Sequence, residues 1–390
     1  MSAAIAPDIP ALPTASLGSI YEITQPPLKI NIQKLSQWAL QVASRDIIQN
    51  DNCFQYRVNS CCRAVLIPGA GVDIYERLRK FHYSGLLTCG SVWLCPVCAL
   101  KVSETRKQEL KVAIEKNKEL GGSAQFWTFT APHHLGQSLK FLLEALGKAR
   151  GKMLNRKSYK LQISSLGVRG TVRALEVTFS YNNGWHVHFH VLAFMNGASP
   201  EYDLKQIEDV FSKLWAAACV DSGLGEPSRA HGVTVQNGSA ADKYIGKWGV
   251  EDELTKWHVK KGKGDKGLTP FDFLRAHAVG DTQYDKLFQE YARAFSGKRQ
   301  LDWSTGLRDR LRMGEAAPDD QVAGELSAES VFFANIPSEV WRVILKDELR
   351  GEVLAVCKDG LQALVDFIVK LCGVDIEASM NPMVRKLYRS

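Results

Sequence analysis

Residues 185–192 read Trp185-His186-Val187-His188-Phe189-His190-Val191-Leu192, with histidine at three successive even positions. Side chains alternate between the two faces of a β-strand, so this spacing predicts three imidazoles on one face and apolar side chains on the other. Two neighbouring imidazoles can hold a single cation. The stretch therefore predicts a strand with a buried face and a metal-binding face.

The residues before this strand predict its hairpin partner. A β-rich arm from Thr171 leads into the turn cluster Tyr181-Asn182-Asn183-Gly184. If the loop is Asn182-Asn183-Gly184, Tyr181 pairs with Trp185 and Glu176 lies across from His190. The hairpin then gathers two or three histidines and one carboxylate, a set that suits Mg²⁺, Mn²⁺, Fe²⁺ or Zn²⁺. The alternatives are a two- or four-residue turn, which turns Glu176 to the other face, and half-exposed histidines without a metal.

A second pattern lies further along the chain, where Tyr244 and Lys247 are three residues apart and share one face of a predicted helix. A cation and a lysine near a tyrosine hydroxyl both favour the phenolate, which is a nucleophile. Taken alone the pair is a weak signal, and a buried tyrosine with a satisfied hydroxyl is the alternative.

Six of the nine cysteines fall between Cys53 and Cys98, and the absence of an export signal favours thiolate metal ligands over disulfides. Cys95-Pro96-Val97-Cys98 forms a metal knuckle, and Cys89 precedes it. Structural zinc takes four ligands. The sequence leaves Cys61, Cys62, Cys53 and His82 open as the fourth, with unligated thiols as the alternative.

The charge is unevenly spread along the chain. The 390 residues carry a net charge of +7, and residues 1–314 carry +12 against −5 from residue 315 onward. A basic balance favours a polyanion such as nucleic acid, with solvated surface charge as the alternative. Four lysines lie in a glycine-spaced loop that suits phosphate contacts: Lys256, Lys260, Lys261 and Lys263. No stretch is apolar enough to cross a membrane, and a cytoplasmic protein is expected.

Together these motifs resemble the replication initiator proteins of rolling-circle plasmids, single-tyrosine members of the His-hydrophobe-His endonuclease superfamily. The resemblance runs from about residue 61 to residue 247. Its parts occur in the family's order: the segment 89–98, the strand 126–130, Glu176-Val177-Thr178, the histidine strand 186–192, and Tyr244 with Lys247.

The resemblance implies an α+β fold with a central antiparallel sheet flanked by helices. It implies that His188 and His190 bind a divalent cation, Mg²⁺ or Mn²⁺, with Glu176 as third ligand and His186 as an auxiliary. Tyr244 would nick one strand of single-stranded or cruciform origin DNA, and Lys247 would stabilise charge. Some relatives carry a glutamate where this chain has Ala240, so the residue that ends a replication round is left open. Host helicase, polymerase and self-association are left open as further partners.

We expect five parts in the chain: a flexible arm (1–30), a Cys-rich zinc-binding segment and helix (31–120), a catalytic endonuclease domain (121–314), an acidic linker (315–327) and a helical C-terminal region (328–390). Two rival functions use fewer of the motifs. A non-haem iron oxygenase would use His188, His190 and Glu176 as its triad but leaves the cysteines idle. A non-catalytic zinc-containing DNA-binding regulator leaves the histidines idle.

Overall fold

The computed structural model describes residues 35–49, 51, 56–197, 204–237, 267–325 and 329–372. The predicted arm (1–30), Cys53, Tyr244, Lys247 and the lysines at positions 256, 260, 261 and 263 lie outside the described residues.

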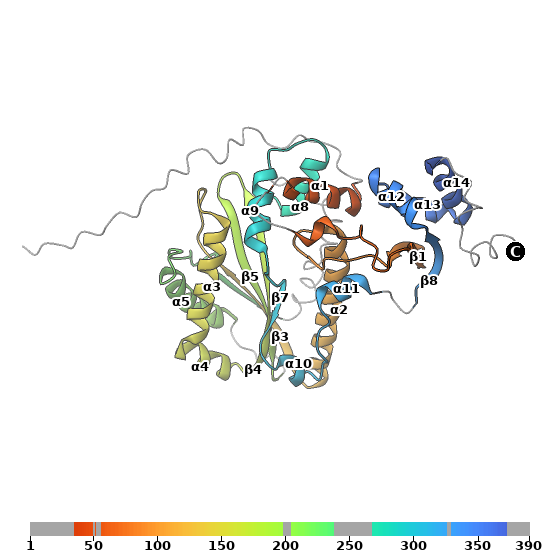
Figure 1. The fold of residues 1–390 in the computed structure, drawn as a ribbon. Helices are drawn as coiled ribbons and strands as arrows, with labels where there is room; N and C mark the ends of the chain where they lie inside the picture. The colour runs from red at the N-terminus through yellow and green to blue at the C-terminus, as the bar shows by residue number, and fades with distance from the viewer. Residues whose placement is uncertain are drawn as a thin grey trace, which may run out of the picture.

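The centre of the molecule is a five-stranded sheet in the order β6-β3-β5-β4-β7, with every neighbouring pair antiparallel. The histidine stretch is β5, the middle strand (Figure 1). The strands are β3 (Ser123–Thr130), β4 (Val168–Ser180), β5 (Gly184–Met195), β6 (Val233–Asn237) and β7 (Leu301–Trp303). The predicted α+β class with an antiparallel sheet flanked by helices is confirmed.

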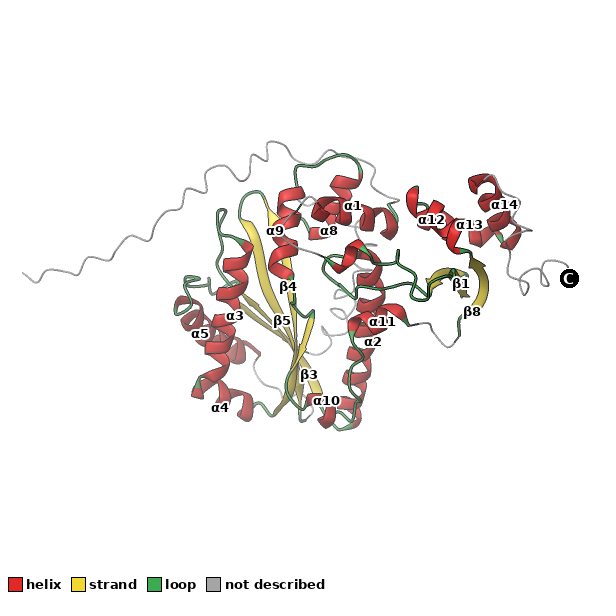
Figure 2. Ribbon diagram, viewed as in Figure 1, coloured by secondary structure: helices red, strands yellow, loops and turns green. Residues whose placement is uncertain are grey.

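Helices cover both faces of this sheet (Figure 2). One face carries α3 (Leu139–Asn155), α4 (Lys157–Ser165) and α5 (Leu204–Val220), and the other carries α2 (Pro96–Glu119) and α10 (Leu307–Arg310). Three further helices lie beyond one end of the sheet: α1 (Gln37–Gln49), α8 (Pro270–Ala278) and α9 (Asp285–Phe295).

The sequence of α3 shows why this layer forms. The Ser138 side chain accepts a hydrogen bond from the Phe141 amide and caps the helix, as serine does at N-caps. Buried leucines at 139, 142, 143 and 146 follow with helical spacing. Each buried leucine contributes about 2 kcal/mol. This face packs on the odd-numbered side chains of β5, which leaves the even-numbered histidines on the opposite face.

α2 occupies only part of the histidine face. Leu110, Ala113 and Ile114 pack against Leu192 and Phe194 at the end of β5 that follows the histidines. The helix therefore closes that end of the face without covering Glu176, His188 or His190 by its apolar side.

A smaller antiparallel sheet, in the order β2-β1-β8, joins the Cys-rich segment to the C-terminal region. Its strands are β1 (Val72–Arg77), β2 (Lys80–Ser84) and β8 (Val331–Ile336). The C-terminal region, expected to be helical, therefore also supplies a strand, whose pairing with a segment about 260 residues away gives no local sequence signal. Its helical elements are α12 (Ser338–Lys346), α13 (Arg350–Val356), η3 (Cys357–Asp359) and α14 (Leu361–Cys372), and η1 (Arg57–Asn59) precedes β1.

The stretch expected as an acidic linker holds a helix, α11 (Asp319–Gly324), that packs on α2. The Arg106 guanidinium donates to Asp319, and the Thr88 hydroxyl donates to the Asp320 carbonyl. Gly90 lies so close to Asp320 that a Cβ added there would come within 2.5 Å of the Asp320 amide nitrogen. This segment is therefore fixed against the cysteine loop.

Within the described residues, none of the helices combines the length and the apolar character that crossing a membrane requires.

Candidate metal centre

The hairpin of β4 and β5 positions the candidate ligands. Its loop is Tyr181-Asn182-Asn183, and Ser180 pairs with Gly184, whose φ of +73° lies in the left-handed region that favours glycine. The predicted loop began one residue later. Glu176 consequently pairs with His188, and the predicted pairing with His190 is wrong. The register is displaced by two residues, an even number, so Glu176 remains on the histidine face.

Three side chains converge on one point of this face. Glu176 Oε2 lies 2.7 Å from His190 Nε2 and 3.2 Å from His188 Nε2, and the two Nε2 atoms are 3.0 Å apart. The predicted set Glu176, His188 and His190 is thus brought together, because the diagonal neighbour on the facing strand is within reach of a glutamate.

The surroundings of His190 fix its orientation. Its Nδ1 lies 3.1 Å from the Thr128 hydroxyl on β3, and its ring stacks on Phe126 with centroids 5.1 Å apart. A partner at Nδ1 leaves Nε2 to face the cluster, which is the arrangement of metal-ligating histidines. Nδ1 of His188 is buried and has no hydrogen-bond partner among the described residues.

The electrostatics of the group favour an ionised carboxylate. Burial raises the pKa of Glu176, but the hydrogen bonds to His188 and His190 outweigh it and hold the pKa well below its usual range. Burial, with His188 and His133 nearby, lowers the pKa of His186 to about 4. A cation requires deprotonated ligands, and the ionised carboxylate of Glu176 meets that requirement.

These donors fit a divalent cation. Two imidazole nitrogens and one carboxylate oxygen, all within about 3 Å of one another, form a three-ligand set on one side, and the Glu176 side chain is 40% exposed. Such a set leaves coordination positions open for water or substrate, as catalytic sites do. Mixed nitrogen and oxygen ligation does not select one metal.

His186 lies next to this group without belonging to it. Its Nδ1 is 3.4 Å from Nε2 of His133, and its ring lies 4.9 Å from that of His188. His133 was missed by the sequence reasoning. The signal that could have found it is the pair His133-His134, which follows the end of β3 directly after Pro132 on the strand next to β5.

Tyr244 and Lys247, the predicted nucleophile and its partner, lie outside the described residues. The described chain stops at Asn237 on β6 and resumes at Gly267. There, a Cβ added to Gly267 would lie 3.0 Å from the Thr178 hydroxyl, and Leu268 bridges Phe179. Thr178 faces His186 across the hairpin, so the chain resumes beside the histidine face.

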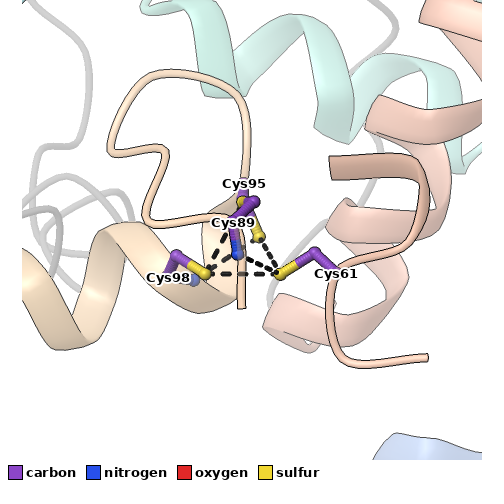
Figure 3. A group of neighbouring side chains, drawn as sticks. All are labelled: Cys61, Cys89, Cys95 and Cys98. Carbon is purple, nitrogen blue, oxygen red and sulfur yellow. Dashed lines mark hydrogen bonds between the residues drawn. The ribbon is translucent and has the colours of Figure 1, made fainter. Parts of the chain in front are cut away.

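A second cluster unites Cys61, Cys89, Cys95 and Cys98, all buried (Figure 3). Cys61 Sγ lies 3.4 Å from Cys98 Sγ and 3.7 Å from Cys95 Sγ, and Cys89 Sγ lies 3.7 Å from Cys98 Sγ. Four thiolates about 2.3 Å from a tetrahedral zinc would be about 3.8 Å apart. The cluster therefore has the dimensions of a structural zinc site.

Neighbouring groups prepare these sulfurs for ligation. The Cys98 amide donates to Cys95 Sγ at the N-cap of α2, and the Cys89 amide donates to Cys61 Sγ. Hydrogen bonds from Cys62, Cys89 and Cys95 lower the pKa of Cys61 to about 5. Cys62 Sγ approaches only Cys61, at 3.8 Å, and neither it nor His82 joins the four-sulfur group within the described residues. Of the predicted fourth ligands described, Cys61 completes the set.

Gln41 of α1 connects the cysteine cluster to the C-terminal region by hydrogen bonds. The Gln41 amide donates to Cys95 Sγ at 3.1 Å, and its carbonyl oxygen accepts a 2.8 Å bond from Arg350. Arg350 is fully buried, donates to the Cys62 carbonyl and pairs with Glu348. The candidate zinc-binding cysteines and the C-terminal region thus share one hydrogen-bonded network.

Comparison with known proteins finds a matching family model and similar sequences. A family model described as "Replication protein" matches residues 86–332. A protein called "Protein rep" from Streptomyces lividans is 27% identical over 308 residues, which cover 60% of this chain and 66% of that protein.

Two shorter similarities accompany it. "Protein rep" from Lentilactobacillus hilgardii is 30% identical over 32% of this chain and 39% of its own length. A "Neomycin resistance protein" from Streptomyces cyanogenus is 32% identical over 29% of this chain and 31% of its own length. The chain thus spans between about a third and two thirds of these relatives. No solved structure matches it.

Proposed function

The chain belongs to the replication protein family, whose model covers residues 86–332, and on this basis we propose that it initiates rolling-circle replication by nicking one DNA strand at an origin. The kinship with plasmid replication initiators that the motifs indicated is confirmed at the level of the family. The nicking activity and the residues that perform it are the proposal.

The observation that carries the proposal is the convergence of Glu176, His188 and His190 on one face of the central sheet. In the proposed site, these residues hold Mg²⁺ or Mn²⁺, and His186 and His133 support them. The cation, when bound, supplies positive charge that polarises a phosphate and offsets the charge growing on its oxygens.

Tyr244 is the proposed nucleophile. Its phenolate oxygen attacks the phosphorus of one phosphodiester, a new O–P bond forms, and the bond to the 3′ oxygen breaks. The 3′ oxygen takes up a proton and leaves as a free hydroxyl that a polymerase can extend. The 5′-phosphotyrosyl link conserves the energy of the broken bond, so the strand can be rejoined without ATP. Lys247 stabilises the phosphate or the phenolate.

The remaining predictions complete the proposal. The four cysteines hold a structural zinc that organises the segment before α2. The partner is single-stranded or cruciform origin DNA, contacted at its phosphates by Lys256, Lys260, Lys261 and Lys263. A host helicase, a polymerase and a second copy of the chain are proposed further partners, and the cytoplasm is the proposed compartment.

Neither rival function has comparable support. An iron oxygenase would use the same three ligands, but the family match concerns replication. A regulator without catalysis has no use for an ionised carboxylate placed between two imidazole nitrogens.

The decisive test incubates the full chain with labelled single-stranded DNA from its own replicon and Mn²⁺. We expect an adduct that survives SDS, its loss in Tyr244→Phe, and unchanged DNA binding by that variant. Tyr181→Phe is the matched control and should keep the adduct. An adduct that persists in Tyr244→Phe would place the nucleophile elsewhere. Tyr284 suits that role poorly, since it is buried and burial raises the pKa of its hydroxyl.

The adduct assay, together with a measurement of the zinc content, can separate the two proposed metal sites. His188→Ala with His190→Ala should abolish the Mn²⁺-dependent adduct while the purified variant keeps its zinc. Loss of zinc in this double variant would show that the two clusters are not independent.

A further inference from the structure

The outer surface of α3 and α4 is strongly basic. These two helices and the residue between them hold seven basic side chains and one acidic one, Glu144, a net charge of +6 in 27 residues, whereas the whole chain carries +7. The neighbouring helix α5 has no net charge, because it holds two basic and two acidic residues: Lys205, Lys213, Glu208 and Asp209.

Three of the seven cations have partners within the fold. Arg150 pairs with Asp302 at 3.3 Å, Arg156 pairs with Asp221 at 2.7 Å, and Lys152 donates to the Asp221 carbonyl. The other four are exposed and form no ion pair within the described part of the chain: Lys140, Lys148, Lys157 and Lys160. Four unpaired like charges on two consecutive helices repel one another, so an anionic partner would relieve a real cost.

This surface lies on the opposite side of the sheet from the histidines. Met153 of α3 and Tyr159 of α4 line a small cavity together with Phe189 and Val191, the odd-numbered residues of β5. His188 and His190 point the other way. A strand held at the metal centre therefore cannot reach these lysines except by passing around an edge of the sheet (Figure 1).

We propose that the α3–α4 surface binds the phosphate backbone of double-stranded DNA, separately from the strand held at the metal centre. The proposal rests on the proposed function, which brings origin DNA to this protein, and adds the surface that holds its duplex part. Lysine heads act as point charges toward phosphates and need no particular base sequence.

Two features favour duplex over single-stranded DNA. Surfaces for single strands stack successive bases on aromatic rings, but here Phe141 is the one markedly exposed ring, and Tyr159 is buried. On α3, Gly147 is exposed and Gly151 is half-buried, and a Cβ added to either would meet nothing within 4 Å. The face between Lys148 and Lys152 is therefore flat enough for a sugar-phosphate backbone to lie against the helix.

The spacing of the charges is compatible with one strand of a duplex. Four residues of helix separate Lys148 from Lys152, a rise of about 6 Å. Successive phosphates of one DNA strand are about 3.4 Å apart along the duplex axis, so phosphates one or two steps apart are within reach of two long lysine side chains with this spacing. Lys148 and Lys152 can therefore approach phosphates of the same strand, since Lys152 has further N–H donors besides the one on Asp221.

The test compares two charge-reversal variants of the full chain. Lys148→Glu with Lys160→Glu changes the proposed surface, and Lys205→Glu with Lys213→Glu makes the same change in charge on α5. Binding to a fluorescent duplex of about 30 base pairs and to a single strand of equal length is measured by anisotropy between 50 and 200 mM salt, the range over which phosphate contacts dominate the affinity.

We expect the α3–α4 variant to bind the duplex at least about tenfold more weakly, with a salt slope smaller by about two, one unit for each lost phosphate contact. Single-strand binding should be unchanged, and the α5 variant should match the wild type. An α3–α4 variant with the wild-type duplex affinity and slope would overturn the proposal, as would equal weakening of duplex and single strand. Circular dichroism of both variants tests whether these surface changes leave the fold intact.

Failure of this proposal and failure of the proposed function give different results. A wild-type chain that binds duplex through these lysines but forms no adduct with single-stranded DNA would leave the α3–α4 surface standing and refute the nicking. A chain that forms the adduct while both variants bind duplex like the wild type would do the reverse.

Discussion

The Thr128 hydroxyl contacts His190 and orients its ring toward Glu176 and His188. The hydroxyl lies 3.1 Å from Nδ1, and this contact holds the ring so that Nε2 meets Glu176 and His188. Such supporting contacts commonly account for 10- to 100-fold in metal affinity, roughly.

Thr128→Val should weaken Mn²⁺ binding at the histidine site by about tenfold or more, because the valine keeps the shape and removes the partner of Nδ1. Mn²⁺ titration followed by electron paramagnetic resonance measures it. Thr234→Val, on the neighbouring strand β6 opposite Thr128, is the control and should bind normally. Equal affinity of the two variants would contradict the prediction.

The adjacent cysteines at 61 and 62 should behave differently. Cys61→Ser should lower the zinc content of the purified chain well below one equivalent, because Cys61 belongs to the four-sulfur group. Cys62→Ser should retain one equivalent, since its sulfur approaches only Cys61. Mass spectrometry of the metal content distinguishes them, and zinc loss in both variants would refute the assignment.

Alternation and register explain why part of this site could be predicted from the sequence. Strict alternation was enough to place His188 and His190 on one face, and an even register was enough to add Glu176. Nothing local distinguished Cys61 from Cys62. That choice depends on Cys62 having a φ of +53°, in a loop whose path is set by contacts with distant segments.

Two glycines in the interior of α3 lower the stability of this helix. Gly147, which is exposed, and Gly151, which is half-buried, lie in the helix interior, where glycine costs roughly 1 kcal/mol relative to alanine. Gly147→Ala should therefore raise the free energy of unfolding by up to about 1 kcal/mol, as measured by urea denaturation. Gly122→Ala is the contrasting variant and should destabilise the protein, because its Cβ would lie 2.4 Å from the Met195 carbonyl oxygen.

The start of α2 has a local cause. The helix begins at Pro96 because Cys95 caps it and proline suits the first turn. The hairpin loop was misplaced by one residue, because several polar residues around Gly184 are compatible with a turn and only the pairing of the whole strands decides between them. β8 could not be predicted as a sheet partner, since its pairing with β1 is non-local.

Glu348 forms ion pairs with three segments, two of which are far from it in the sequence. It pairs with Arg45 of α1, with Arg63 before β1, and with Arg350 of α13. Burial raises the pKa of Glu348, but the hydrogen bond from Arg45 and the charges of Arg350 and Arg63 outweigh it, and the pKa lies below its ordinary value.

This shift predicts an acid-sensitive link. Because the pKa is lower in the folded than in the unfolded chain, the ionised carboxylate contributes its full stabilisation above the unfolded value of about 4.3 and loses it as the pH falls through the folded value. Glu348→Gln should cost about 2 kcal/mol at pH 7, less than a fully buried pair because the side chain is 26% exposed. The cost should shrink below about pH 4.3.

Urea denaturation at several pH values measures this cost. Glu352→Gln is the matched control, since Glu352 is exposed and forms no ion pair within the described residues. A cost that is the same at pH 7 and at low pH, or equal for the two variants, would contradict the role given to Glu348.

The pairing of β1 with β8 has a consequence for how the protein is made. Val72 pairs with Ile336, which is synthesised much later. At roughly 5–20 residues per second, the ribosome reaches Ile336 about 13 to 50 s after Val72. The cysteine loop and the histidine hairpin are synthesised within that interval. During this time β1 pairs only with β2, and a two-stranded ribbon has marginal stability. A chain truncated before residue 331 would therefore keep the residues of both candidate ligand groups and leave this edge of β1 permanently unpaired, which favours aggregation.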